Sequence, residues 1–302
     1  MSTTDDRRIF VAIASYRDPE TGPTIGNMFS LADRPSLVSV GLCWQRSDGE
    51  DRMLLGPYPR GRVAVRAYHS SESRGAGWAR SVAHAMRGSE PYVLQVDSHM
   101  RFHRGWDTSL LNMLAACGSD RPILSTYPAT YEPPRSMGPC GSWSLRASRF
   151  NRQGMLSFAG TEVVAPFPVP HAWIAGGLIF APSRFFDEVP YDPSVYFLGE
   201  EASLAARAWT SGWDSFAPNQ CVVHHYYGRH EARRHWDDDA AWSDADRVSV
   251  GRVRKILGGP PATDPRSNDA TDGPLGLGSK RTLSQFELYA GVSFSERWIR
   301  PR

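Results

Sequence analysis

The chain has 302 residues, of which 22% are charged, and its 34 Lys and Arg and 32 Asp and Glu give a formal net charge of +2. This length is sufficient for one large domain with a sizeable core. The near-neutral balance disfavours a surface that binds nucleic acid through its phosphates. No apolar run is as long as a membrane-spanning helix, so we expect no membrane partner.

The N-terminal segment and the cysteines indicate a compartment. "MSTTDDRRIF" is acidic and polar, unlike a signal or transit peptide. The four cysteines are far apart and form no CxxC pair, which favours free thiols in a reducing compartment over a disulfide framework. We therefore expect a globular cytoplasmic protein, and the sequence leaves its oligomeric state open. The cysteines are Cys43, Cys117, Cys140 and Cys221.

Strands and helices are expected to alternate along the chain. Apolar runs predict buried strands, and apolar residues at every third or fourth position predict helices. This alternation predicts an α/β fold, with a mostly parallel central sheet flanked by helices. In such a sheet, ligands bind beyond the carboxyl ends of the strands. Strands are expected at 9–14, 37–45, 61–70, 92–97, 122–128, 172–186 and 214–225, and helices at 24–35, 75–88, 106–117, 199–213 and 282–294.

Two segments interrupt this alternation. Residues 128–170 are rich in Pro, Gly and Ser, and we interpret them as a long excursion rather than a second domain. Residues 258–279 have the composition of a mobile linker. We therefore expect one domain over residues 1–257, followed by a linker and a docking tail over 258–302. Asp107 or Thr108 is expected to cap the helix at 106–117.

The stretch "YVLQVDSHMRFHRGWD" places Asp97 and His99 where a predicted strand ends. Alternate strand residues point the same way, so both could bind one metal ion; a helix cap, a surface ion pair or a satisfied polar pair are the structural alternatives. A later strand ends in His224 and His225, only one of which can face the same site. One carboxylate and two imidazoles suit Mn²⁺ better than Mg²⁺.

Other polar and glycine positions are candidates for the same site. Gly176 and Gly177 within a predicted strand favour a ligand close to the backbone, or else a bulge or tight packing. Glu200 and Glu201 are either favourable first-turn carboxylates of a helix or site residues that bind hydroxyls or orient a nucleophile. Arg74 and Arg80 flank "GAGWA", where a helix N-terminus could bind phosphate. We interpret "HEARRH", with Asp237, Asp238 and Asp239, as a charged surface face.

Three stretches together resemble a known family. "RGAGWARSVAHAMRGSEPYVLQVDSHMRFHRGWDTSLLNML", "AWIAGGLIFAPSRFFDEVPYDPSVYFLGEEASLAARAWTSGW" and "PNQCVVHHYY" resemble segments of the polypeptide N-acetylgalactosaminyltransferases. "DSHMRF" and "GLGSKRTLSQFELYAGVSF" are more similar to the cytoplasmic GlcNAc-transferases that modify protein hydroxyproline and to their bacterial relatives. The resemblance covers roughly residues 8–257 and the tail.

The resemblance implies a single GT-A (Rossmann-like) glycosyltransferase domain that retains anomeric configuration. The implied donor is a UDP-sugar, and UDP-GlcNAc is the UDP-sugar that the resemblance favours. The implied acceptor is a hydroxyl group on a protein or peptide. The implied metal is Mn²⁺, with Mg²⁺ as the alternative, held by Asp97 and His99 and by His224 or His225. Further implied donor contacts come from Ser15, Tyr16, Arg17, Arg74, Arg80, Ser98, Gly176 and Gly177, and the implied catalytic carboxylates are Glu200 and Glu201.

Two other functions stay open at this level. A metal-dependent sugar nucleotidyltransferase also uses an Asp at a strand end, although "SYRDPETG" is a poor version of its glycine-rich loop. A nucleotide-sugar-binding module without activity is the second. The resemblance does not extend to the lectin domain of the polypeptide GalNAc-transferases, because no stretch of this sequence matches it. This argues against a mucin-type acceptor.

Overall fold

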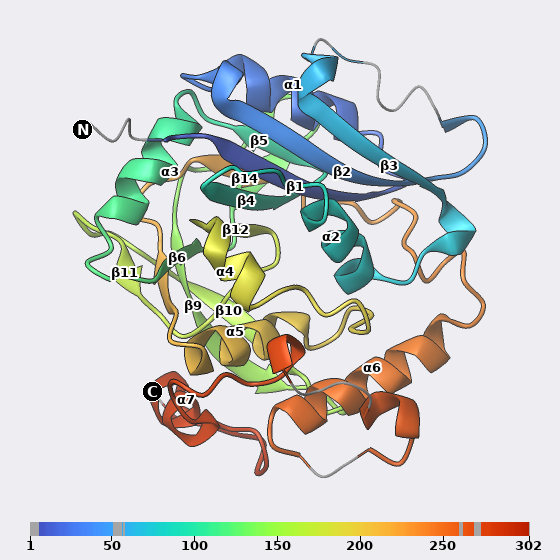
Figure 1. Cartoon of the computed structure of the whole chain (residues 1–302), viewed down its shortest axis with the longest axis vertical. Coiled ribbons are helices and arrows are strands. Elements are labelled where there is room, and N and C mark those ends of the chain that lie inside the picture. Colours follow the sequence, from blue (N-terminus) through green and yellow to red (C-terminus); the bar gives the residue numbers. More distant parts are fainter. Residues whose placement is uncertain (1–5, 51–55, 57, 260–261, 269–272, 302) are drawn as a thin grey trace.

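The computed structural model describes residues 6–50, 56, 58–259, 262–268 and 273–301. A mixed sheet of eight strands forms its centre, in the order β11-β13-β6-β12-β4-β1-β2-β3 (Figure 1). Strands β3, β2, β1 and β4 run parallel, and β12 is antiparallel to both of its neighbours. The strands are β1 (Ile9–Tyr16), β2 (Val38–Arg46), β3 (Val63–His69), β4 (Tyr92–Asp97), β6 (Pro122–Ser125), β11 (Val169–Pro170), β12 (Leu178–Pro182) and β13 (Asp214–Ala217).

Helices cover both faces of the middle of this sheet because its central strands are apolar on both sides, whereas the edge strand β3 is largely exposed. Along β1, Ile9, Val11 and Ile13 enter a core shared with α1 and α3, whereas Phe10 and Ala12 enter a second core shared with α2 and α5. This is the two-sided burial expected of a parallel sheet. The helices are α1 (Thr21–Leu31), α2 (Ala76–His84), α3 (Trp106–Ala115), α4 (Ser183–Glu188), α5 (Glu200–Thr210), α6 (Trp242–Ile256) and α7 (Leu283–Ala290).

Smaller sheets flank the central one and consist largely of the predicted excursion. Strand β14 (Val223–His225) lies between β5 (Met100–Phe102) and β7 (Ala129–Glu132), and β8 (Ser136–Met137) completes this four-stranded sheet. Strands β9 (Trp143–Phe150) and β10 (Leu156–Glu162) form a hairpin. Residues 128–170 are thus an ordered excursion of short strands.

Several sequence expectations were wrong in detail. The strand expected over 214–225 is two strands in different sheets, β13 and β14, which Pro218 separates. Gly176 and Gly177 lie in the turn before β12 rather than within a strand. Helix α3 is capped by Gly105, not by Asp107 or Thr108; instead, the Asp107 carboxylate accepts backbone hydrogen bonds from Asp33 and Arg34. Helix α6 was not anticipated.

The C-terminal segment packs against the rest of the chain at the lower end of the view, where α7 lies to the left and α6 to the right (Figure 1). Phe286 of α7 is fully buried against Trp173, and Tyr289 stacks on Trp209 of α5. Part of the expected mobile linker, residues 260–261 and 269–272, lies outside the described residues. None of the helices described combines the length and hydrophobicity that crossing a membrane requires.

Candidate active site

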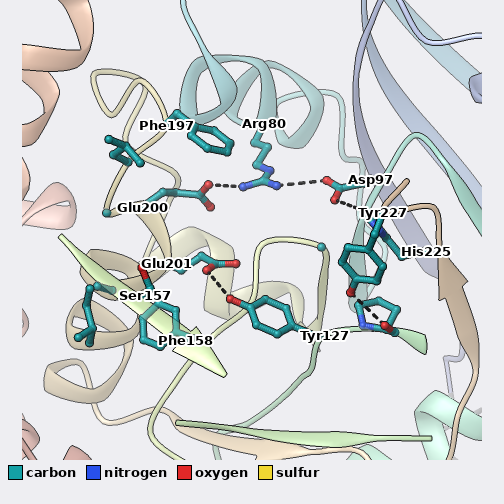
Figure 2. A pocket seen from close by; sticks show the side chains of 16 residues that line it. Arg80, Asp97, Tyr127, Ser157, Phe158, Phe197, Glu200, Glu201, His225 and Tyr227 are labelled. Carbon is teal, nitrogen blue, oxygen red and sulfur yellow. Dashed lines mark hydrogen bonds and ion pairs between the residues drawn. The ribbon is translucent and has the colours of Figure 1, made fainter. Parts of the chain in front are cut away.

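A cavity of about 400 Å³ opens where β4, the turn before β12 and the first turn of α5 meet. Figure 2 shows Arg80 between Glu200 and Asp97 on one side of this cavity, with Glu201 and Tyr127 facing it from the other. The β10 segment closes the remaining wall. The lining residues are Arg80, Asp97, Tyr127, Pro128, Leu156, Ser157, Phe158, Gly177, Phe197, Leu198, Gly199, Glu200, Glu201, Ala202, His225 and Tyr227.

Arg80 of α2 forms ion pairs with Asp97 at the end of β4 and with Glu200 at the start of α5. One guanidinium nitrogen binds Glu200, and the other lies 3.2 Å from Asp97 Oδ1. A Cβ on Gly176 would lie 2.5 Å from the Arg80 guanidinium, so any larger residue there would force Arg80 to shift. With its side chain only 11% exposed, Arg80 requires these carboxylates as counter-charges.

Asp97, at the carboxyl end of β4, lies beside two histidines. His225 Nε2 donates to Asp97 Oδ2 over 3.1 Å, and the rings of His99 and His225 are 4.5 Å apart. Burial alone would raise the pKa of Asp97, but the hydrogen bond from His225 and the charge of Arg80 lower it well below its usual range. Asp97 is therefore a permanent negative charge at this position.

These three residues fit a divalent metal ion. Their ligand atoms all lie within 4.8 Å of one another. His225 Nδ1 is buried and has no hydrogen-bond partner among the described residues. One carboxylate oxygen and two imidazole nitrogens form a donor set that suits Mn²⁺ and leaves positions for other ligands. Of the two histidines that the sequence left open, the structure brings His225 to Asp97 and turns His224 to the other side of β14.

Asp18 and its hydrogen-bond partners fix the orientation of the His99 ring. The buried Asp18 accepts hydrogen bonds from Ser98 Oγ (2.5 Å) and His99 Nδ1 (2.8 Å), which leaves His99 Nε2 without a proton. Arg229 lies 3.2 Å from the same carboxylate. Burial would raise the pKa of Asp18, but His99 and Arg229 lower it to about 2. Arg229 also lies 3.3 Å from His99 Nε2, so a cation bound there requires Arg229 to move.

The two first-turn carboxylates of α5 have different environments. Gly199, the residue before α5, adopts the left-handed conformation (φ +79°) that directs this turn toward the cavity. Glu200 pairs with Arg80, and its Oε1 is buried without a partner in the part of the chain described. Glu201 accepts hydrogen bonds from the Gly176 amide (2.8 Å) and the Tyr127 hydroxyl (3.1 Å). Burial and the nearby Glu200 raise the pKa of Glu201 to about 7.

A second cavity, of about 250 Å³, adjoins the first and shares Arg80, Asp97, Phe197 and His225 with it. Tyr16 and Gln45, near the carboxyl ends of β1 and β2, line its floor, and residues 233–236 line another wall. The adjoining cavities lie off the carboxyl ends of β1 and β4, as parallel sheets predict.

The interpretation of "HEARRH" as a charged surface face was wrong for part of that stretch. The His235 ring packs 4.7 Å from both Tyr196 and Trp236, and burial lowers its pKa to about 4. Neither His235 nitrogen has a hydrogen-bond partner among the described residues, and His235 lines the second cavity. Arg234 lines it as well. The sequence could not predict that His235 is buried, because its burial depends on packing against Tyr196, which is distant in the sequence.

Of the other candidate residues, some line the second cavity and others lie outside both cavities. Ser98 and Tyr16 line the second cavity, although the Tyr16 hydroxyl donates to Asp238 (2.7 Å). Ser15 is fully buried and hydrogen-bonds to Thr21. The remaining two arginines lie outside both cavities: Arg17 pairs with Glu50 and Asp238, and Arg74 is exposed over the Trp78 ring.

Several residues of the site were not singled out from the sequence. Asp18 follows the first strand, and this position is the one signal that could have identified it. Tyr127, Phe197, Tyr227 and Arg229 carried no local signal, because loops that are distant in sequence bring them to the cavities.

The profile of the family described as Glycosyltransferase (GlcNAc) matches residues 8–58 and 55–296. A solved structure of GalNAc-T7 with UDP, GalNAc and Mn²⁺ has a TM-score of 0.58 at 15% identity, over 84% of this chain and 48% of that chain. A structure of S. aureus TarS 1-349 has a TM-score of 0.49 at 13% identity, over 86% of this chain and 68% of that chain. No curated relative matches. The chain thus spans about half of the GalNAc-T7 chain, and this likeness is one of fold.

Proposed function

The chain belongs to the Glycosyltransferase (GlcNAc) family and has a GT-A fold, and from this premise we propose a specific reaction for it. The enzyme transfers a sugar from a UDP-sugar to a hydroxyl group on a protein or peptide, and GlcNAc is the sugar that we propose. The transfer is metal-dependent and retains the anomeric configuration. The observation that carries this proposal is the convergence of Asp97, His99 and His225 between two adjoining cavities.

The nucleoside of the donor occupies the second cavity. Tyr16 offers an aromatic surface there, and Gln45 and the unpartnered nitrogens of His235 can hydrogen-bond to a nucleobase. His235 is neutral at pH 7 because its pKa is lowered by burial, so one of its nitrogens donates and the other accepts. The diphosphate then passes Asp97 and His225, two of the four residues that both cavities share.

Asp97, His99 and His225 would hold the metal ion. When bound, Mn²⁺, or Mg²⁺ in its place, supplies Lewis-acid stabilisation of the negative charge on the departing UDP. Asp18 fixes the tautomer of His99, and Arg80 keeps Asp97 in place across 3.2 Å.

The first cavity receives the donor sugar and the acceptor. Glu200 Oε1, buried and without a partner among the described residues, is suited to accept a hydrogen bond from a sugar hydroxyl. Glu201 is partly protonated near pH 7 and already accepts two hydrogen bonds, so it is a poor nucleophile. In a retaining reaction the acceptor attacks on the face that UDP leaves, and a phosphate oxygen can take its proton. We therefore assign no carboxylate the role of nucleophile.

The stereochemistry of the released sugar tests this mechanism without a known acceptor. UDP-GlcNAc is α-linked, so hydrolysis with retention first releases the α-anomer, which proton NMR identifies before mutarotation. First release of the β-anomer would contradict retention and make Glu201 the candidate general base. The same samples distinguish the alternatives: dependence on pyrophosphate indicates a nucleotidyltransferase, and UDP-GlcNAc binding without turnover in calorimetry indicates a binding module.

A further inference from the structure

A second group of metal-ligating side chains lies on the other side of β14 from His225. It consists of His103, Cys140, Cys221 and His224. His103 follows β5, Cys140 lies in the loop between β8 and β9, and the other two belong to β14 or directly precede it. Three segments that are distant in the sequence thus converge, and all four ligand atoms lie within 4.8 Å of one another.

The separations between these atoms match a tetrahedral site. A zinc ion with ordinary Zn–N and Zn–S bonds sets roughly 3.3 Å between two nitrogens and roughly 3.6 Å between nitrogen and sulfur. His103 Nε2 lies 3.0 Å from His224 Nδ1, 3.4 Å from Cys140 Sγ and 3.7 Å from Cys221 Sγ. The other three donor atoms therefore already stand about one tetrahedral edge from His103 Nε2.

An outer hydrogen bond orients the His224 ring as metal sites require. His224 Nε2 donates to the Gly138 carbonyl over 3.1 Å, which leaves Nδ1, the nitrogen that faces the cluster, without a proton.

We propose that His103, Cys140, Cys221 and His224 form a structural Zn²⁺ site, separate from the donor-sugar site. Two thiolates and two imidazoles with no further position form a closed set, which is typical of structural rather than catalytic zinc. The ion would fasten the β8–β9 loop and the start of β14 to the residue after β5. Since His224 and His225 point to opposite sides of one strand, the zinc would also hold His225 in position beside Asp97.

Metal analysis of the full-length, untagged protein, purified without chelators, tests this proposal. We expect about one zinc per chain, and proton release on reloading the metal-free protein. Replacing zinc by Co²⁺ should produce thiolate-to-cobalt charge transfer in the near ultraviolet and the strong visible absorption of tetrahedral cobalt. This spectrum needs no variant and is independent of whether a substituted protein folds.

Variants assign the site. Cys140→Ser and Cys221→Ser should each lower zinc affinity by more than about tenfold. Cys117→Ser, which replaces a buried thiol elsewhere in the core, and Asp97→Asn, which disrupts the donor site, should both keep the zinc. The proposal is overturned if wild-type protein binds no zinc, if the double variant Cys140→Ser/Cys221→Ser keeps it, or if these two cysteines form a disulfide instead.

Discussion

Replacing Glu201 by Gln should stabilise the protein at high pH and leave it unchanged at low pH. The folded pKa of Glu201, about 7, lies above its ordinary value of 4.5 because burial and the charge of Glu200 oppose ionisation. The contribution of Glu201 to stability is therefore fully present below pH 4.5 and is lost as the pH rises through 7. Glutamine keeps both hydrogen bonds, since its amide oxygen can accept from Gly176 and its amide nitrogen can donate to Tyr127.

The magnitude follows from the shift. A change from 4.5 to about 7, at about 1.4 kcal/mol per pKa unit, makes ionised Glu201 cost about 3 kcal/mol of folding free energy. The free energy of unfolding of Glu201→Gln should thus exceed that of the wild type by up to this amount at pH 8.5. The excess should grow between pH 4.5 and 7 and level off above that range.

Urea denaturation followed by tryptophan fluorescence, across this pH range, measures the difference. Glu162→Gln is the matched control, because Glu162 is exposed on β10 and its replacement should change stability equally little at every pH. A Glu201→Gln effect that is independent of pH, or a variant less stable than the wild type at pH 8.5, would refute the reasoning.

Three further substitutions test other parts of the molecule. Asp97→Asn keeps the shape of the side chain but removes its charge, so kcat/KM for donor hydrolysis should fall at least about 100-fold; an unchanged value argues against the metal site. Arg80→Met leaves Glu200 and Asp97 without their shared partner and should lower the free energy of unfolding by about 3 to 5 kcal/mol, measured by urea denaturation; a loss below about 1 kcal/mol argues against this buried network. Arg252→Met breaks a buried ion pair of 2.5 Å with Asp192 and should lower Tm, whereas Asp192→Leu/Arg252→Met should recover part of the loss; a double variant no better than the single one argues against an unpaired charge as the cause.

Hydrophobic periodicity was sufficient to predict the central elements of the fold. The alternating and continuous apolar runs identified β1 and β4, and the position of Asp97 at a strand end located the site. Helix α6 was missed, although Val250, Val253 and Ile256 repeat at helical spacing. This repeat could have predicted the helix from the sequence. Tertiary packing, by contrast, decides that the 214–225 segment breaks at Pro218 and joins two sheets.

The composition of the site could be predicted only in part. Because successive side chains of a strand point to opposite faces, the sequence shows that His224 and His225 face opposite sides. Which of the two reaches Asp97 depends on how β14 pairs with β5. The cysteines looked unrelated because Cys140 and Cys221 meet only through the flanking sheet. Arg229 likewise has no local pattern and is recruited by the buried charge of Asp18.

Metal-dependent cleavage of UDP-sugars tests the central proposal most directly. We would measure UDP release from a panel of UDP-sugars by wild-type protein and Asp97→Asn, each with Mn²⁺ and with EDTA. We expect release of UDP from UDP-GlcNAc with Mn²⁺, and loss of this release both with EDTA and in Asp97→Asn. No release from any UDP-sugar, or equal release with EDTA, would contradict it.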